Sequence, residues 1–164
     1  MGTAVGRNRG ASGTVEGSES IRMAEPVQSC DVPIRVRYSE TDAMGYLHHA
    51  RYFVYFEEGR IELLRRSGLR YRDMEARGCF YVVARLECQF RAPAHYDDVL
   101  TLTTAVQRLT PVRVEHSYDL RRDDKLLAQA QSTIVSVGRD GRPQPLPEDV
   151  YAVLRGVARP GEVH

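Results

Sequence analysis

The pattern of apolar and polar residues divides the first part of the chain in two. From Asp31 onward, apolar residues alternate with mostly polar ones, and this period of two predicts a half-buried strand that runs into a loop at residues 39–45. The alternating apolar positions are Val32, Ile34, Val36 and Tyr38. Residues 1–29, rich in Gly, Ser and Glu, show neither this period nor one of 3.6. We therefore predict a disordered leader there, with Met23 as a candidate true start.

A period near 3.6 residues follows and predicts a long helix over residues 49–66. One face carries Tyr52, Phe53, Phe56, Gly59, Leu63 and Leu64, while the other carries Arg51, Glu58, Glu62 and Arg65. Val54 and Ile61 interrupt the polar face, so we expect this helix to be covered from more than one direction. Ser67-Gly68 is predicted to end it, and a shorter helix is expected over residues 71–77.

The rest of the chain has the composition of long strands, rich in β-branched and aromatic residues. These segments are residues 80–90, 99–109, 112–121 and 126–137. Their connections are short, so we expect neighbours to pair antiparallel as a meander. A last turn of helix is expected near residues 149–154, followed by a flexible tail over residues 158–164. One strand, one long helix and four antiparallel strands make an α+β fold with the helix on one face of the sheet.

Composition excludes several classes of function. The 164 residues suit one domain, and 23 basic against 22 acidic residues give a net charge of +1, which does not favour nucleic acid. The three cysteines lack metal-site spacing and are interpreted as reduced, buried thiols, and we predict no metal. Without a membrane span or signal peptide, we expect a soluble cytoplasmic protein. The chain has no GxSxG, P-loop or GxGxxG motif.

Three stretches resemble the signature of a known family. They run from Tyr38 to Tyr52, from Phe56 to Arg60 and from Phe90 to Asp98. Together they resemble the 4-hydroxybenzoyl-CoA thioesterase family, and within it the bacterial acyl-CoA thioesterases associated with the Tol-Pal system, over residues 34–137. The resemblance implies a single hotdog domain, at residues 30–157, in which an antiparallel sheet wraps a long central helix. It also implies homodimers or homotetramers with active sites at the subunit interface. The implied substrate is an acyl-CoA, and no cofactor is expected, because the coenzyme A is part of the substrate.

The resemblance also assigns candidate catalytic residues. It places the family's carboxylate on Asp42, as nucleophile on the thioester carbonyl or as general base for a water. The backbone N–H that polarises the carbonyl falls on His49, and a further site residue falls on Tyr38. Elementary physics agrees, because the first N–H groups of a helix lack partners and can stabilise the negative oxygen of the transition state. Gly45 and His49 follow Asp42 by only three and seven residues, so both groups can face one carbonyl.

Other residues near this signature have alternative interpretations. Taken alone, Asp42 would be a helix cap or an Asx-turn residue, and His48 and His49 would be a pair of loop histidines near the start of a helix. Gly45, Tyr46 and Tyr52 are candidate substrate-binding residues, although core packing is the usual role of a residue such as Tyr52 or Phe53. A related hotdog branch carries its carboxylate on the central helix. Here, however, Glu58 is expected to be solvated and Glu57 to pair with Arg60.

Two arginines are candidates for the CoA phosphates. Family members with a recognised nucleotide site use basic residues at a turn between two long strands, and the matching turn here carries Arg108 and Arg113 without the consecutive basic run. The sequence thus predicts an acyl-CoA thioesterase of unassigned acyl group, short aliphatic or aromatic. The alternatives are a non-catalytic hotdog module that binds acyl-CoA or a protein, an enzyme for acyl carrier protein thioesters, and a CoA-dependent dehydratase.

Overall fold

The computed structural model describes residues 29–157. Its elements in chain order are β1 (Ser29–Arg35), a 3-10 turn (Tyr38–Glu40), α1 (His49–Arg66), α2 (Tyr71–Ala76), β2 (Phe80–Phe90), β3 (Val99–Leu109), β4 (Arg113–Arg122), β5 (Lys125–Val137) and α3 (Glu148–Val157). The predicted leader, apart from Ser29, which begins β1, lies outside the described residues, as do the candidate start and the flexible tail. The predicted helices and later strands are confirmed to within a few residues at each end.

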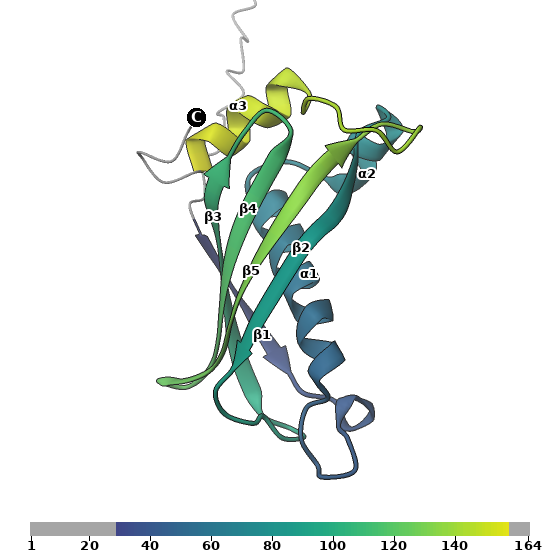
Figure 1. Ribbon diagram of the computed structural model, residues 1–164. Helices are drawn as coiled ribbons and strands as arrows, with labels where there is room; N and C mark the ends of the chain where they lie inside the picture. The colour runs from purple at the N-terminus through teal and green to yellow at the C-terminus, as the bar shows by residue number, and fades with distance from the viewer. Residues whose placement is uncertain (1–28, 158–164) are drawn as a thin grey trace, which may run out of the picture.

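The five strands form one antiparallel sheet in the order β1-β3-β4-β5-β2. The predicted meander is therefore correct for β3, β4 and β5 but wrong for β2, which pairs with β5 and not with its sequence neighbour β3. The connection through α1 and α2 carries the chain from one edge of the sheet to the other, so β1 and β2 become the two edge strands. Figure 1 shows the curved sheet with α1 lying along one of its faces, as predicted.

α1 packs on the side of the sheet formed by β1 and β3. The approach is close at Gly59, where an added Cβ would lie 2.3 Å from Thr104 Oγ1 and 2.7 Å from Leu102 Cδ2. Two expectations for the pattern were wrong. Tyr38 is 78% exposed because the strand ends at Arg35 and the chain turns. Phe53 is 39% exposed, because α1 lies over β1 and β3 and its buried stripe is turned toward them.

The buried residues of α1 include two that the sequence pattern did not reveal, Tyr55 and Arg60. Val54 is exposed, in keeping with the predicted apolar patch on the far side of the helix. The three cysteines carry free thiols, of which Cys88 is only half-buried instead of buried as predicted.

The edge strand β2 leaves apolar side chains uncovered. Val83 pairs with Ile134, and Phe90 with Ala128, and these β5 partners are buried on the α1 side of the sheet. Since paired residues point to the same face, Val83 and Phe90 also face that side, yet they are 49% and 51% exposed. The helix thus covers only part of this face.

α3 and the loop that leads into α1 lie at opposite ends of the molecule (Figure 1). The segment before α3 contacts the β3–β4 turn, where Leu146 N donates to the Pro111 carbonyl at 2.8 Å. Within residues 29–157, no helix is long and apolar enough to span a membrane.

Candidate active site

Asp42 lies in a small exposed hairpin between the 3-10 turn and α1. Its N–H donates to the Tyr46 carbonyl at 2.8 Å, and its carbonyl accepts from Gly45 N at 2.9 Å. Gly45 has a φ of +76°, a left-handed conformation that glycine adopts without steric cost. A bridge between Thr41 and Leu47 closes the base of the hairpin. The glycine is thus required by the turn that presents Asp42.

The carboxylate of Asp42 is fixed on one side only. Oδ1 accepts from Met44 N at 2.8 Å and from Tyr46 N at 3.2 Å, so Asp42 does form an Asx-turn. Oδ2 accepts no hydrogen bond from any described residue, and the side chain is exposed. The structural interpretation and the catalytic one are therefore compatible, because the Asx-turn orients the carboxylate and leaves one oxygen for chemistry.

The start of α1 offers a free amide. His48 is the N-cap residue, and its Nδ1 accepts from Ala50 N at 3.2 Å while its carbonyl accepts from Arg51 N at 2.8 Å. His49 lies between the cap residue and Ala50, and its N–H meets no acceptor among the described residues. The rings of His48 and His49 stack, with centroids 4.2 Å apart. His48 is thus a cap, and the backbone of His49 is a donor at the positive end of the helix dipole.

The aromatic candidates fall into different environments. Tyr46 lies on the hairpin with its ring 5.2 Å from that of His95. Tyr38 packs edge-on against Tyr96 at 5.6 Å, and no described hydrogen bond joins it to Asp42. Tyr52 is buried, and this burial raises the pKa of its hydroxyl. Only Tyr46 shares the hairpin of Asp42.

Arg108 and Arg113 flank the β3–β4 turn, at the far end of the sheet from Asp42. β3 begins near the hairpin, because the loop before β3 contacts it: Tyr46 forms a bridge with His95, and Leu47 N donates to the Ala94 carbonyl at 2.8 Å. From Val99 to Arg108 a strand extends roughly 30 Å. Within one chain, the structure therefore does not bring these arginines together with Asp42.

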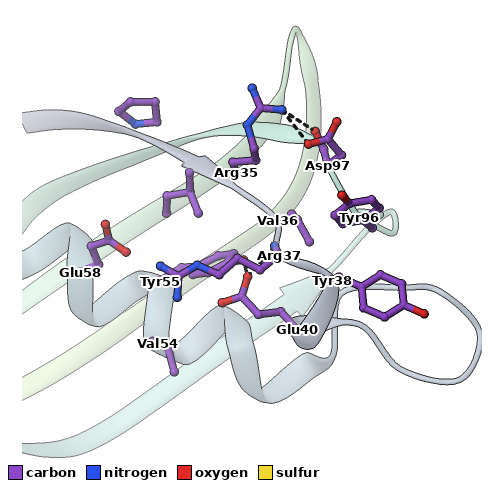
Figure 2. Close-up of a pocket in the computed structure, with 12 residues that line it drawn as sticks. Arg35, Val36, Arg37, Tyr38, Glu40, Val54, Tyr55, Glu58, Tyr96 and Asp97 are labelled. Carbon is purple, nitrogen blue, oxygen red and sulfur yellow. Dashed lines mark hydrogen bonds and ion pairs between the residues drawn. The ribbon is translucent and has the colours of Figure 1, made fainter.

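A groove of about 630 Å³ lies next to the hairpin, between β1 and α1, and Figure 2 shows its lining. Its charged side chains are Arg35, Arg37, Glu40, Glu58 and Asp97, and Arg35 is paired with Asp97 at 2.9 Å. Positive and negative groups nearly balance, so the groove does not attract the phosphates of CoA. In Figure 2 the ring of Tyr38 points away from Glu40.

Glu40 is the residue that sequence reasoning missed. It is buried, and its Oε2 accepts from Tyr55 Oη at 2.7 Å and from Arg37 N at 2.9 Å. Burial, then the hydrogen bond to Glu40, raises the pKa of Tyr55. The only available signal was the position of Tyr55 three residues after Tyr52, on the apolar side of the helix.

The two acidic candidates on α1, Glu57 and Glu58, lie where the sequence predicted. Glu57 pairs with Arg60 at 3.0 Å, which confirms the structural ion pair, and Glu58 is exposed. Between residues 29 and 157 no cluster of three or more His, Cys, Asp or Glu side chains could hold a metal ion. The predicted absence of a metal stays a prediction.

Comparison with known proteins defines the family. Residues 36–154 match the thioesterase-like superfamily. The chain belongs to this superfamily. An Aquifex aeolicus member named "Putative esterase" is 35% identical over 121 residues, covering 74% of this chain and 94% of that protein. The acyl-CoA thioesterase YbgC of Haemophilus influenzae is 31% identical over 125 residues, covering 74% and 91%.

A solved superfamily structure supports the same assignment. The chain named "Probable Thioesterase" from Bartonella henselae aligns with a TM-score of 0.69 and 33% identity, covering 73% of this chain and 99% of that one. The hotdog fold implied by the sequence is thereby confirmed, since both superfamily and architecture agree. The closer resemblance to the 4-hydroxybenzoyl-CoA and Tol-Pal-associated branch stays a prediction.

Proposed function

We propose that the protein is an acyl-CoA thioesterase that hydrolyses the thioester to a free acid and CoA. The observation that carries this proposal is a carboxylate with one free oxygen, Asp42, held seven residues before a helix whose first N–H, that of His49, is free. The name of the Haemophilus relative, an acyl-CoA thioesterase, supports the same substrate class. Acyl-CoA as substrate also favours the cytoplasm as the place of action.

The chemistry assigns one task to each group. Asp42 attacks the thioester carbon directly, or removes a proton from a water that attacks it. The carbonyl oxygen becomes negative, and the N–H of His49 donates to it, a contribution typically worth about 3 kcal/mol for one donor. The C–S bond then breaks, and CoA leaves as its thiol after gaining a proton. The exposed imidazole of His49 can supply that proton. When a water attacks, the free acid is released in this step. When Asp42 attacks directly, the acyl group is left joined to Asp42 as an anhydride, and a water then splits the anhydride to release the acid and restore the carboxylate.

We propose further that the active unit is a homodimer or a tetramer of such dimers. The apolar side chains that β2 leaves exposed, Val83 and Phe90, need a cover, and a second copy of this edge provides a self-complementary one. Arg108 and Arg113 flank the far end of β3, which is a strand length of roughly 30 Å from the end near the hairpin. We therefore expect them to contact the CoA phosphates at the site of another subunit.

The experiment is steady-state hydrolysis of an acyl-CoA panel by the native protein and by Asp42→Asn. The panel contains short aliphatic and aromatic acyl groups, which distinguishes the two specificities expected from the sequence. We expect native turnover and a loss of at least ~100-fold in kcat in the variant. Asp123→Asn, at the β4–β5 turn, is the matched control and should turn over normally.

Two results contradict the proposal. No hydrolysis by the native protein with any acyl-CoA would indicate a non-catalytic binding module or an enzyme for carrier-protein thioesters. Native turnover in Asp42→Asn would move catalysis to another carboxylate, and Glu57→Gln and Glu58→Gln would then be measured.

A further inference from the structure

We propose that Glu40 and Tyr55 are positioning residues that hold the Asp42 hairpin against α1. The inference rests on the proposed function, because it concerns the geometry between Asp42 and the opening of the helix. Neither residue is placed on the substrate. Their effect on hydrolysis passes through the orientation of Asp42.

The burial of Glu40 requires an explanation. It is 7% exposed and is the one acidic side chain that the fold buries within residues 29–157. Burying a carboxylate costs free energy unless hydrogen bonds replace its lost water. Two donors meet its Oε2, Tyr55 Oη at 2.7 Å and Arg37 N at 2.9 Å, and Figure 2 shows the three residues gathered between the 3-10 turn and α1.

Glu40 is tied to the helix at two points. Its side chain accepts from Tyr55, in the second turn of α1, and its backbone carbonyl accepts from the N–H of the cap residue His48 at 2.9 Å. These contacts fix both the position of the chain and its direction as it leaves the 3-10 turn. Asp42 follows only two residues later, so its place relative to the amide of His49 depends on them.

The rest of the hairpin has little else to hold it to α1. Residues 42–46 are exposed. The remaining supports within the described residues include no hydrogen bond to a side chain of α1: Leu47 N donates to the Ala94 carbonyl at 2.8 Å, Tyr46 pairs with His95 through a backbone bridge and a ring contact, and the side chain of Leu47 is buried in the core. Among the described side chains of residues 40–46, only that of Glu40 hydrogen-bonds to a side chain of α1. Loss of this contact should let the hairpin shift relative to the helix.

The test compares kcat and KM for Tyr55→Phe, Glu40→Asp and Glu40→Gln. Misplacement of a reacting group by about 1 Å can cost up to ~100-fold in rate, so Tyr55→Phe should lower kcat by about 10- to 100-fold with little change in KM. Glu40→Asp, whose shorter chain does not reach Tyr55, should do the same. Glu40→Gln keeps an acceptor of the same shape and should retain kcat within about 3-fold.

Two further variants separate positioning from simple destabilisation. Tyr118→Phe removes a buried hydrogen bond of the same length, 2.7 Å between the Tyr118 hydroxyl and Ser132 Oγ, which joins β4 to β5 and does not involve the hairpin. It should lose similar stability in urea unfolding and keep its kcat. In an Asp42→Asn background, Tyr55→Phe should cause no additional loss, because its effect acts through Asp42.

The outcomes are distinguishable. A folded Tyr55→Phe or Glu40→Asp with native kcat overturns the positioning role, and so does a full multiplicative loss in the Asp42→Asn background. If Tyr55→Phe does not fold, Glu40→Asp alone decides the question, and recovery by Glu40→Gln confirms it. Native turnover in Asp42→Asn would instead overturn the proposed function.

Discussion

His116 should make the protein lose stability when the pH falls from 7 to 5. The side chain lies on β4, is 7% exposed, and its Nδ1 meets no partner among the described residues. Burial, with a smaller contribution from the nearby Arg60 guanidinium, lowers the pKa of His116 to about 3. The folded protein therefore holds this imidazole neutral, whereas the unfolded chain takes up a proton near the ordinary pKa of about 6.5.

The direction and the size of this pH effect follow from the difference between the pKa of His116 in the folded and the unfolded protein. Because the folded pKa is depressed, the stabilisation is fully present above about pH 6.5 and is lost as the pH falls toward 3. Between pH 7 and pH 5, the unfolded state gains about 2 kcal/mol from protonation, while the folded state gains almost nothing. This is a large share of the 5–15 kcal/mol that typically separates folded from unfolded domains.

The assay is urea unfolding of the native protein and of His116→Leu at pH 7, 6 and 5, at one protein concentration. We compare the change of unfolding free energy with pH rather than its absolute value, because the substitution also alters packing against Tyr118. The native protein should lose about 2 kcal/mol more than the variant between pH 7 and 5. Equal slopes in the native protein and His116→Leu would refute the buried, neutral imidazole.

Two further predictions concern parts of the fold that support the site. Gly59→Ala should lower the unfolding free energy by about 1–2 kcal/mol, because overpacking against Leu102 and Thr104 outweighs the better helix propensity of alanine. The double variant Gly59→Ala with Thr104→Ala should recover part of this loss. A Gly59→Ala variant that is more stable than the native protein would contradict the close approach of α1 to β3. Asp98 accepts from His95 N at 2.8 Å and Arg122 Nη1 at 2.6 Å, and these bonds outweigh its burial and lower its pKa. The ionised carboxylate of Asp98 should therefore stabilise the folded protein above about pH 4, and this stabilisation should be lost below that pH. In the same assay, Asp98→Asn should lower the unfolding free energy by about 2 kcal/mol at pH 7, and the variant should not show the additional loss of stability on acidification.

The sequence predicted the elements well because their periods are strong. The helix over residues 49–66 and the strands over 80–90 and 99–109 combine clear apolar patterns with Gly or Pro at their ends. The order of the strands was not predictable in the same way. Short loops favour neighbouring pairs, but the choice of β5 as partner for β2 is decided by how the connection through α1 and α2 crosses the sheet. That is a property of the whole fold.

Prediction of the candidate site depended on local contiguity. Asp42, Gly45 and His49 lie within eight residues, so the hairpin and the helix opening could be inferred from the chain alone. The tie between Glu40 and Tyr55 could not, since it depends on which face of α1 turns toward the 3-10 turn. Tyr38 illustrates the same limit. Alternation placed it on a strand, but the chain turns at the end of β1 and exposes its ring.

The most direct test of the central claim is a crystal structure of Asp42→Asn with a bound acyl-CoA. We expect the thioester oxygen to lie about 3 Å from the backbone nitrogen of His49, with the side chain of residue 42 facing the carbonyl carbon directly or through one water. A thioester bound elsewhere, with the His49 N–H still free and residue 42 turned toward solvent, would contradict it.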